Sequence, residues 1–292
     1  MDTKLIDGNE IAAKIKENLV KDIKNIKAKG IIPHLEAVLV GENAGARIYA
    51  QNQEKACKEL DISYKLNELP ETTSQKELED FVQKLNENPK VTGIILQMPV
   101  PSHINGREVQ MKISPSKDVE GIHPFNIGKL LYGEAVLAPC TALAVMEILK
   151  SINVHLKGKE VVVVGHSEIV GKPLMLLLLQ SYLESPTPTI CHIATKDLAS
   201  HTKRADILIV AAGRAGLVKG DMIKEGAIVI DVGINRVIKK DENGKVIEKK
   251  IVGDVVFDEA VQKASMITPV PGGVGPVTTV MLLKNTIEAA KK

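Results

Sequence analysis

Aromatic residues are almost missing from this chain of 292 residues, which has no tryptophan, three phenylalanines and four tyrosines. The core must therefore be built from valine, isoleucine, leucine and alanine. Basic runs interleaved with aromatic residues, which are typical of nucleic-acid-binding surfaces, are absent as well. The 38 lysines and arginines nearly balance the 36 aspartates and glutamates, for a net charge of +2. We therefore expect no nucleic acid partner.

Cysteine is also scarce. Cys57, Cys140 and Cys191 form an odd, scattered set with no Cys-x-x-Cys spacing. This pattern argues against a secreted disulfide scaffold and against a zinc cluster, since both need paired or closely spaced thiols. No His-Glu-x-x-His spacing accompanies the histidines either. We expect free thiols in a reducing compartment and no bound metal.

Long apolar segments are missing too. The longest apolar run, at residues 174–179, is far too short to cross a bilayer. Residues 1–4 lead into no apolar core of a signal peptide. These absences predict a cytoplasmic protein without membrane contact.

The sequence does contain a regular alternation of helical and strand-like segments. Ser74 and Glu77 form a capping box that opens a predicted helix to about residue 86, and Thr141 is expected to cap another helix. Apolar runs typical of buried strands lie at 35–40, 62–69, 91–97, 160–165, 189–193, 207–211, 227–232 and 266–267. This alternation predicts an α/β fold with parallel sheets that carry helices on both faces.

The chain is long enough for two ordinary domains. We expect the boundary near Thr141, which separates a first domain at 1–140 from a second at 141–276. The C-terminal helix, at 277–292, is expected to pack back on the first domain.

A strand, a glycine-bounded turn and a helix start follow one another at residues 161–173. In this geometry a dinucleotide pyrophosphate rests on the N–H groups of a helix N-terminus. The match to Gly-x-Gly-x-x-Gly is imperfect, because Ser167 and Val170 stand at the second and third glycine positions after Gly165. The turn indicates a nucleotide site that departs from the general motif.

Two other glycine-containing motifs do not match this turn. A P-loop needs four residues between its glycines and Ser or Thr after its lysine, whereas five residues separate Gly165 from Gly171 and Pro173 follows Lys172. A nucleophile elbow needs glycine where Ile169 stands.

The segment at 267–279 holds three prolines and three glycines, so we expect a loop there rather than a helix or strand. A helix is predicted to follow, with Pro276 in its first turn. A stiff loop with exposed backbone, between a strand and a helix, is a common ligand-binding position in α/β proteins. A rigid connector is the alternative interpretation.

Together these segments resemble the methylenetetrahydrofolate dehydrogenase/methenyltetrahydrofolate cyclohydrolase family over nearly the whole chain. The turn at 165–173 looks like the family's own nucleotide loop, and 269–276 is similar to its proline-glycine loop. Shorter matches, in the shared order and spacing, lie at 6–8, 97–101, 117–121, 139–141, 232–235 and 253–255.

The resemblance implies a two-domain homodimer with an N-terminal α/β folate domain, a C-terminal Rossmann-type doubly wound parallel sheet and a cleft between them. It implies hydride transfer from 5,10-methylenetetrahydrofolate to NAD(P), followed by hydrolysis to 10-formyltetrahydrofolate. The residues implied for catalysis and folate binding are Tyr49, Gln53, Gln97, Glu120, Pro271, Gly272 and Gly273. Those implied for cofactor binding are Gly165, His166, Ser167, Ile193 and Ile234.

Two departures concern the folate side. The family pairs a tyrosine with a lysine four residues later on one helix, but Gln53 follows Tyr49 here. An amide forms hydrogen bonds but does not carry a proton near neutral pH, and Lys55 projects roughly 240° around the helix from Tyr49. Glu120 stands where the family has an aspartate that holds the pterin. We therefore expect hydride transfer to persist and hydrolysis to be weak or absent, with full bifunctional activity as the alternative.

A third departure concerns the cofactor. NADP-using members often carry arginine after the first glycine of the nucleotide loop and Ser-Arg after the next strand, whereas His166, Ile193 and Ala194 stand there. His166 and His192 are interpreted as surface or cofactor-edge residues rather than metal ligands. NADP is the family default, and the missing cationic partners make a preference for NAD a hypothesis.

Two other functions stay open. One is a nicotinamide-dependent dehydrogenase for another small acid, and the other is a binding protein for folate or nucleotide without catalysis. Cys140 is interpreted as a packing residue rather than a nucleophile, because no patterned histidine accompanies it.

Overall fold

The computed structural model describes residues 3–240 and 246–291. The chain divides into two compact units. The N-terminal unit comprises Ala13–Cys140 with Thr279–Lys292, and the C-terminal unit comprises Met1–Ala12 with Thr141–Thr278. The division falls within helices α1 (Gly8–Lys27) and α10 (Val274–Ala290). Both units are α/β, as the alternation of segments predicts.

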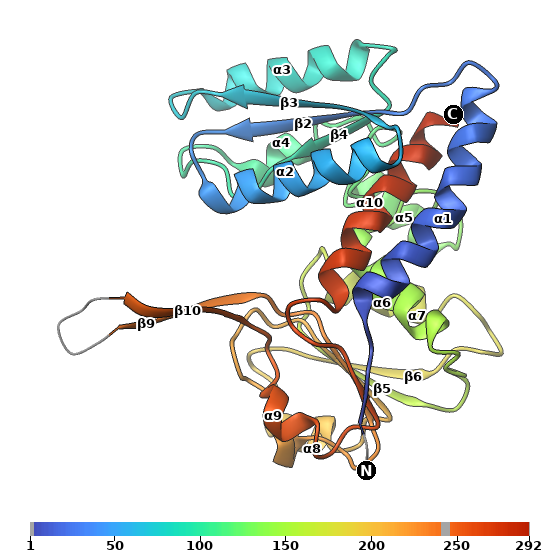
Figure 1. The fold of residues 1–292 in the computed structure, drawn as a ribbon, viewed down its shortest axis with the longest axis vertical. Helices are drawn as coiled ribbons and strands as arrows, with labels where there is room; N and C mark the ends of the chain where they lie inside the picture. The colour runs from blue at the N-terminus through green and yellow to red at the C-terminus, as the bar shows by residue number, and fades with distance from the viewer. Residues whose placement is uncertain (1–2, 241–245, 292) are drawn as a thin grey trace. The chain divides into compact units, whose positions relative to one another are not determined.

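A three-stranded parallel sheet forms the centre of the N-terminal unit. Its order is β3 (Ser63–Leu69), β2 (His34–Val40) and β4 (Gly93–Leu96). Figure 1 shows α3 (Gln75–Glu87) and α2 (Ala44–Glu59) on opposite sides of β2 and β3. The predicted capping box is confirmed, because the Ser74 side chain accepts from the Glu77 N–H and the Glu77 side chain accepts from the Ser74 N–H. The unit also contains α4 (Gly106–Gln110) and α5 (Pro124–Leu131).

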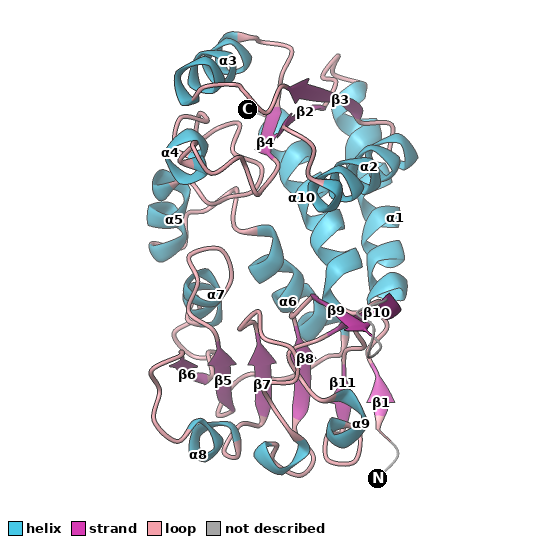
Figure 2. Ribbon diagram, turned by 90° about the vertical axis from the view of Figure 1, so that its left-hand side faces the viewer, coloured by secondary structure: helices cyan, strands magenta, loops and turns pink. Residues whose placement is uncertain are grey.

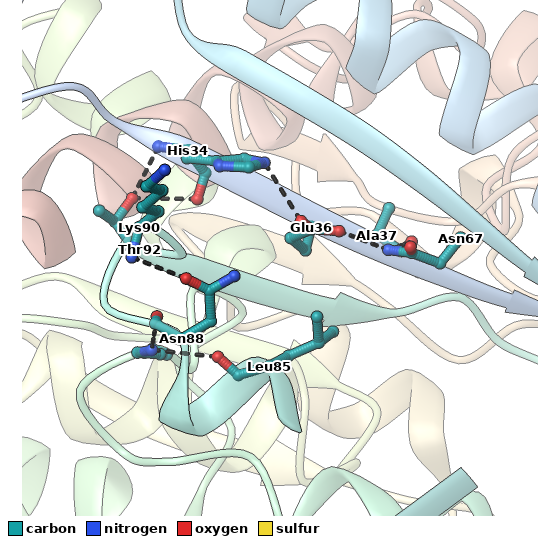
Figure 3. A network of polar contacts seen from close by, with 9 residues as sticks. His34, Glu36, Ala37, Asn67, Leu85, Asn88, Lys90 and Thr92 are labelled. Atoms are coloured by element: carbon teal, nitrogen blue, oxygen red, sulfur yellow. Dashed lines mark hydrogen bonds and ion pairs between the residues drawn. The ribbon is translucent and has the colours of Figure 1, made fainter. Parts of the chain in front are cut away.

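A buried polar network fixes the register of this sheet (Figure 3). The Glu36 carboxylate on β2 accepts from Asn67 Nδ2 at 2.5 Å and lies 3.3 Å from His34 Nε2. Thr92, just before β4, accepts from the His34 N–H at 2.8 Å and donates to the His34 carbonyl. The central strand is thus tied to both neighbours through side chains as well as through the backbone ladder.

Six parallel strands form the sheet of the C-terminal unit, which Figure 2 shows side by side. In spatial order they are β1 (Lys4–Leu5), β11 (Met266–Ile267), β8 (Ile228–Asp231), β7 (Ile207–Val210), β5 (Glu160–Val164) and β6 (Thr187–Cys191). The unit's helical segments are α6 (Cys140–Ser151), α7 (Gly171–Leu178), α8 (Leu198–Thr202), α9 (Phe257–Ala260) and a 3₁₀ turn at Gly220–Met222. The inner strands β5, β7 and β8 are mainly aliphatic and buried, as is usual for a parallel sheet covered on both faces, whereas the edge strands β1 and β6 are more polar and more exposed.

Two features of the C-terminal unit were not predicted. β1 adds a strand at the edge of the sheet beside β11. β9 (Asn235–Lys240) and β10 (Val246–Val252) pair antiparallel in a sheet of their own, and Figure 1 shows this ribbon extending from the unit.

Several predicted boundaries were wrong. The strand expected at 91–97 is shorter, because β4 comprises only Gly93–Leu96. The strand expected at 189–193 ends at Cys191, because a turn follows in which the His192 N–H donates to Thr195 Oγ1. α6 starts one residue before Thr141, with the Cys140 N–H on the Glu120 carbonyl. The C-terminal helix, expected at 277–292, begins at Val274, and Pro276 lies in its first turn as predicted.

Among residues 3–240 and 246–291, no helix has the length and apolarity needed to cross a membrane.

Candidate active site

Two glycines shape the predicted nucleotide turn. Gly165 directly follows β5 and has a φ of 122°, and a Cβ built on it would lie 2.1 Å from the Ala211 carbonyl oxygen. Gly171 is the first residue of α7, and its Cβ would lie 1.9 Å from the Gly165 carbonyl oxygen. Between them, Ser167 Oγ accepts from the Val170 N–H at 3.2 Å. Side chains are therefore excluded at both ends of the turn, at Gly165 by the backbone that follows β7 and at Gly171 by the backbone of Gly165.

The strand order places this turn at a topological switch point. From β5 the chain passes to β6 on one side and then to β7 on the other. In open parallel sheets, ligands bind outside the carboxyl ends of the strands at such a point. The structure brings the predicted cofactor residues to this edge, since Gly165, His166 and Ser167 follow β5, Ile193 follows β6 and Ile234 follows β8.

The two histidines at this edge stack on each other. The rings of His166 and His192 have centroids 4.7 Å apart and planes 12° apart. The Ala194 N–H donates to His192 Nδ1 at 3.2 Å, which orients that ring. Ile193 beside it is 99% exposed. Both histidines were predicted to be surface or cofactor-edge residues, but their pairing was not predicted; it follows from the adjacency of β5 and β6.

Two buried carboxylates were not among the predicted site residues, although Asp231 directly precedes the motif at 232–235 and Asp254 lies within the motif at 253–255. Asp231 ends β8 and accepts from the backbone N–H groups of Gly233, Asp254 and Val255 at 2.9–3.0 Å. Burial raises the pKa of Asp231 to about 6, against the opposing effect of these N–H donors. Asp254 accepts from the Ala212 and Gly213 N–H groups, described further below.

The N-terminal segment braces the proline-glycine loop. The Gly8 N–H donates to the Gly272 carbonyl at 2.9 Å, and a Cβ on Gly8 would lie 1.7 Å from the Gly273 carbonyl oxygen. This contact accounts for the motif at 6–8. Pro271 is exposed and Gly272 half-buried at φ 104°, whereas Gly273 is buried. Of the three predicted folate-side residues, only Pro271 and Gly272 thus present surface within this unit.

Helix α2 carries the predicted pair of the N-terminal unit. Tyr49 is 51% exposed, whereas Gln53, one turn later, is buried. Gln97 follows β4, is also buried, and donates through Nε2 to Gln53 Oε1 at 2.7 Å. The structure therefore joins two of the predicted residues directly. Both side chains are amides, so the pair carries no charge.

A tightly held loop supplies Glu120. Lys117 Nζ donates to three carbonyl oxygens at the end of α3, those of Leu85, Asn86 and Asn88. The segment then runs parallel to β4 through the bridge between Ile94 and Asp118. This register carries Glu120 toward the same strand end that Gln97 follows.

Electrostatics at Glu120 are unusual. Burial, reinforced by the nearby charge of Asp118, raises its pKa to about 8, although a 3.4 Å hydrogen bond from Gln110 opposes the shift. Asp118 itself accepts from the N–H groups of Gly121 and His123 and from Asn126 Nδ2. Burial and the charge of Asp118 therefore both favour the protonated form of Glu120.

Cys140 behaves as a packing residue in this environment. Its thiol donates to the Val119 carbonyl at 3.3 Å, and Asn285 Nδ2 lies 3.5 Å from its sulfur. Burial, with the carboxylates of Glu120 and Asp118, raises the pKa of Cys140 well above its usual value. A thiol held neutral is a poor nucleophile. Within the described residues, no group of three or more His, Cys, Asp or Glu side chains is placed to hold a metal ion.

Comparisons with known proteins agree with this arrangement. Residues 6–120 match the catalytic domain of tetrahydrofolate dehydrogenase/cyclohydrolase, and residues 139–292 match its NAD(P)-binding domain. The chain is 48% identical over 287 residues to bifunctional protein FolD of Nautilia profundicola, covering 98% of this chain and 97% of the relative.

Solved structures give the same result. The bifunctional enzyme FolD, methylenetetrahydrofolate dehydrogenase/cyclohydrolase, from Campylobacter jejuni superposes with a TM-score of 0.91 at 45% identity over 99% of each chain. FolD of Trypanosoma brucei, complexed with NADP and an inhibitor, gives a TM-score of 0.91 at 39% identity, covering 100% of this chain and 98% of that one.

Proposed function

Because this chain belongs to the tetrahydrofolate dehydrogenase/cyclohydrolase family, we propose that it oxidises 5,10-methylenetetrahydrofolate to the 5,10-methenyl form with a nicotinamide cofactor. The observation that carries this proposal is the turn at the switch point, where Gly165 and Gly171 leave room only for backbone. A pyrophosphate fits such a turn, because the N-terminus of α7 opens there. The cofactor supplies the hydride acceptor when bound.

The residues of the C-terminal unit hold the cofactor in this proposal. Gly165, His166 and Ser167 contact it after β5, and Ile193 and Ile234 contact it from the neighbouring strand ends. Pro271 and Gly272 form part of the folate surface. Hydride transfer requires positioning rather than an acid or base, so a rigid edge built from backbone suits the reaction.

The residues of the N-terminal unit bind the pterin and stabilise its charge. Tyr49 and the Gln53–Gln97 pair belong to the reacting side. Glu120, once ionised, accepts hydrogen bonds from the pterin ring. Oxidation of the methylene bridge leaves a cation on the folate, which an ionised Glu120 and the amide oxygens stabilise.

Hydrolysis of the methenyl product is the second candidate function. Relatives at 45–50% identity are named bifunctional, which favours both activities here over loss of the second. Addition of water and ring opening need proton transfer, and Gln53 carries no proton. We therefore propose that hydrolysis is present but slow, with Tyr49 and water moving the proton.

The side chains at the carboxyl ends of β5 and β6 bear on the choice between NAD and NADP. A 2′-phosphate is best held by arginine in a charge-assisted, bidentate contact. The stacked pair His166 and His192 stands at this edge with Ile193 and Ala194 beside it. NADP is bound by a relative, and we propose that this chain accepts both cofactors with a bias toward NAD.

Assembly and location are part of the proposal. We expect a homodimer in the cytoplasm, as in the family pattern. Cys57, Cys140 and Cys191 are free thiols, which suits a reducing compartment.

The test is folate-dependent reduction of each cofactor by the purified protein. Reduced cofactor and methenyltetrahydrofolate are followed separately, with NAD and NADP compared at the same folate concentration. Equal formation of both products supports the proposal. Intact binding of folate and nucleotide without turnover would establish a binding protein instead, and turnover with a small acid but not with folate would establish the other dehydrogenase.

A further inference from the structure

The buried carboxylate of Asp254 faces the loop that follows β7. Its Oδ2 accepts from the Ala212 N–H at 2.7 Å and from the Gly213 N–H at 2.8 Å. Its Oδ1 accepts from Asn235 Nδ2 at 2.8 Å. Asp254 is fully buried, and these three hydrogen bonds hold its carboxylate; a Cβ on Gly233 would lie 2.3 Å from its Cγ, so glycine is needed beside it.

The loop that Asp254 holds forms one side of the switch point. A trans peptide directs its N–H and C=O to opposite sides of the chain. With the Ala212 N–H on Asp254, the Ala211 carbonyl turns the other way, toward Gly165. Asp254 therefore holds the backbone that follows β7 in place beside Gly165, the residue that follows β5 and begins the predicted pyrophosphate turn.

Asp231 fixes Asp254 in turn. Asp231 Oδ1 accepts from the Asp254 N–H at 3.0 Å, and Oδ2 accepts from the Val255 N–H at 2.9 Å. A Cβ on Gly253 would lie 1.8 Å from Asp231 Oδ2. The Asp231 N–H donates to Thr268 Oγ1, at the start of the proline-glycine loop. One chain of contacts thus runs from that loop through both carboxylates to the β7 edge.

We infer that Asp254, held by Asp231, is a positioning residue for the nicotinamide cofactor. It touches neither cofactor nor folate, and it acts by fixing the Ala212–Gly213 backbone at the nucleotide edge. This inference rests on the proposed function only in taking that edge as the cofactor site.

Direct binding measurements test it. Asp254→Ala leaves two buried N–H groups without their acceptor and is expected to raise the Kd of NAD(P) by about 10- to 100-fold, with the Kd of tetrahydrofolate changed less than about twofold. Asp254→Asn keeps one oxygen and is expected to restore most of the affinity. Calorimetry on the whole protein, below the melting temperature of each variant, gives both constants.

Asp206→Ala is the matched control. Asp206 also accepts a backbone N–H, that of Glu160 at 2.9 Å, but it precedes β7 at the opposite edge of the same sheet. Its replacement is expected to leave the Kd of NAD(P) unchanged.

The possible outcomes are distinct. Equal weakening of folate and cofactor binding in Asp254→Ala would overturn the inference, as would a folded variant with unchanged cofactor affinity. If Asp254→Ala does not fold, Asp254→Asn must still raise the Kd of NAD(P) about threefold. An unchanged Kd in Asp254→Asn would then overturn the inference. Cofactor binding by the wild type without folate turnover would remove the proposed function alone. Absence of cofactor binding by the wild type would remove both.

Discussion

Backbone geometry dominates the carboxyl edge of the six-stranded sheet, whereas side-chain chemistry dominates the candidate folate residues of the N-terminal unit. At the nucleotide edge, Gly165 and Gly171 exclude side chains, and Asp254 acts on N–H groups. In the N-terminal unit, Gln53 and Gln97 meet through their amides. The two regions should therefore respond differently to mutation. A substitution that shifts the backbone at the nucleotide edge should weaken ligand binding. A side-chain substitution in the N-terminal unit can remove one reaction step while the fold is kept.

The largest expected effect comes from restoring a proton carrier. Gln53→Lys should accelerate hydrolysis of supplied methenyltetrahydrofolate by about 10²- to 10⁴-fold, while hydride transfer changes less than about tenfold. The Gln97 amide can turn to accept from the new ammonium. Hydrolysis rates of the two proteins give the comparison.

Gln51→Lys is the matched control for this variant. It makes the same change on the same helix, on an exposed side chain roughly 200° away around the axis. Equal hydrolysis rates in the wild type and in Gln53→Lys would show that position 53 does not limit the second step.

The next largest effect is expected from a substitution in the nucleotide turn, where backbone atoms form the site. Gly165→Ala places a Cβ 2.1 Å from the Ala211 carbonyl oxygen at a positive φ. Displacing the turn should lower kcat/KM for the cofactor by about 100-fold or more. Steady-state kinetics with saturating folate measure it. Gly128→Ala in α5, where no atom lies within 4 Å of the new Cβ, should leave kinetics unchanged. If Gly165→Ala kept the wild-type kcat/KM for the cofactor, the proposal that backbone atoms form the cofactor site would be contradicted.

A smaller effect concerns Glu120. With its pKa raised to about 8, the ionised form that binds the pterin becomes more populated as pH rises, so KM for the folate should fall by about tenfold per pH unit below that pKa. Glu120→Gln should flatten this profile, whereas Glu134→Gln, an exposed carboxylate of the same unit, should leave it intact. A wild-type KM independent of pH would contradict the assignment.

The same shift predicts the pH dependence of stability. The folded protein binds the Glu120 proton more tightly than the unfolded chain does, so its stabilising contribution is complete below about pH 4.5 and is lost as pH rises through 8. Thermal melting should show that loss in the wild type relative to Glu120→Gln. Parallel melting curves across this range would contradict it.

The smallest effect concerns cofactor choice. His166→Arg should raise the ratio of kcat/KM for NADP over NAD by about tenfold, because a guanidinium can stack on His192 and also hold a 2′-phosphate. His155→Arg, an exposed histidine before β5, should leave the ratio unchanged. A wild type that already strongly prefers NADP would contradict the proposed bias.

Local patterns predicted most of the fold. Aliphatic runs such as 207–211 and 227–232 marked buried strands within a residue of their observed limits, because burial on both faces leaves little choice of residue. The end of β6 was misplaced by two residues, since a turn through Thr195 overrides the apolar run. The start of α10 was misplaced by three residues, at 277 instead of Val274, although Pro276 does lie in its first turn as predicted.

Contacts between distant segments escaped prediction. The stack of His166 on His192 depends on which strands are adjacent, and the role of Asp254 depends on a loop about 40 residues earlier in the chain. The brace of Gly8 on the proline-glycine loop is another such contact. Periodicity within one segment carries no information about these pairs. The sequence therefore suggests candidate site residues one by one, but it does not show the contacts that hold them in place.

One time course with wild-type protein, methylenetetrahydrofolate and the preferred cofactor tests most directly whether hydride transfer outpaces hydrolysis. Reduced cofactor, methenyltetrahydrofolate and 10-formyltetrahydrofolate are measured together. With Gln53 limiting proton transfer, methenyltetrahydrofolate should accumulate in step with reduced cofactor, and the formyl product should follow later. If 10-formyltetrahydrofolate appears as fast as reduced cofactor, without accumulation of methenyltetrahydrofolate, the proposal that Gln53 slows hydrolysis is contradicted.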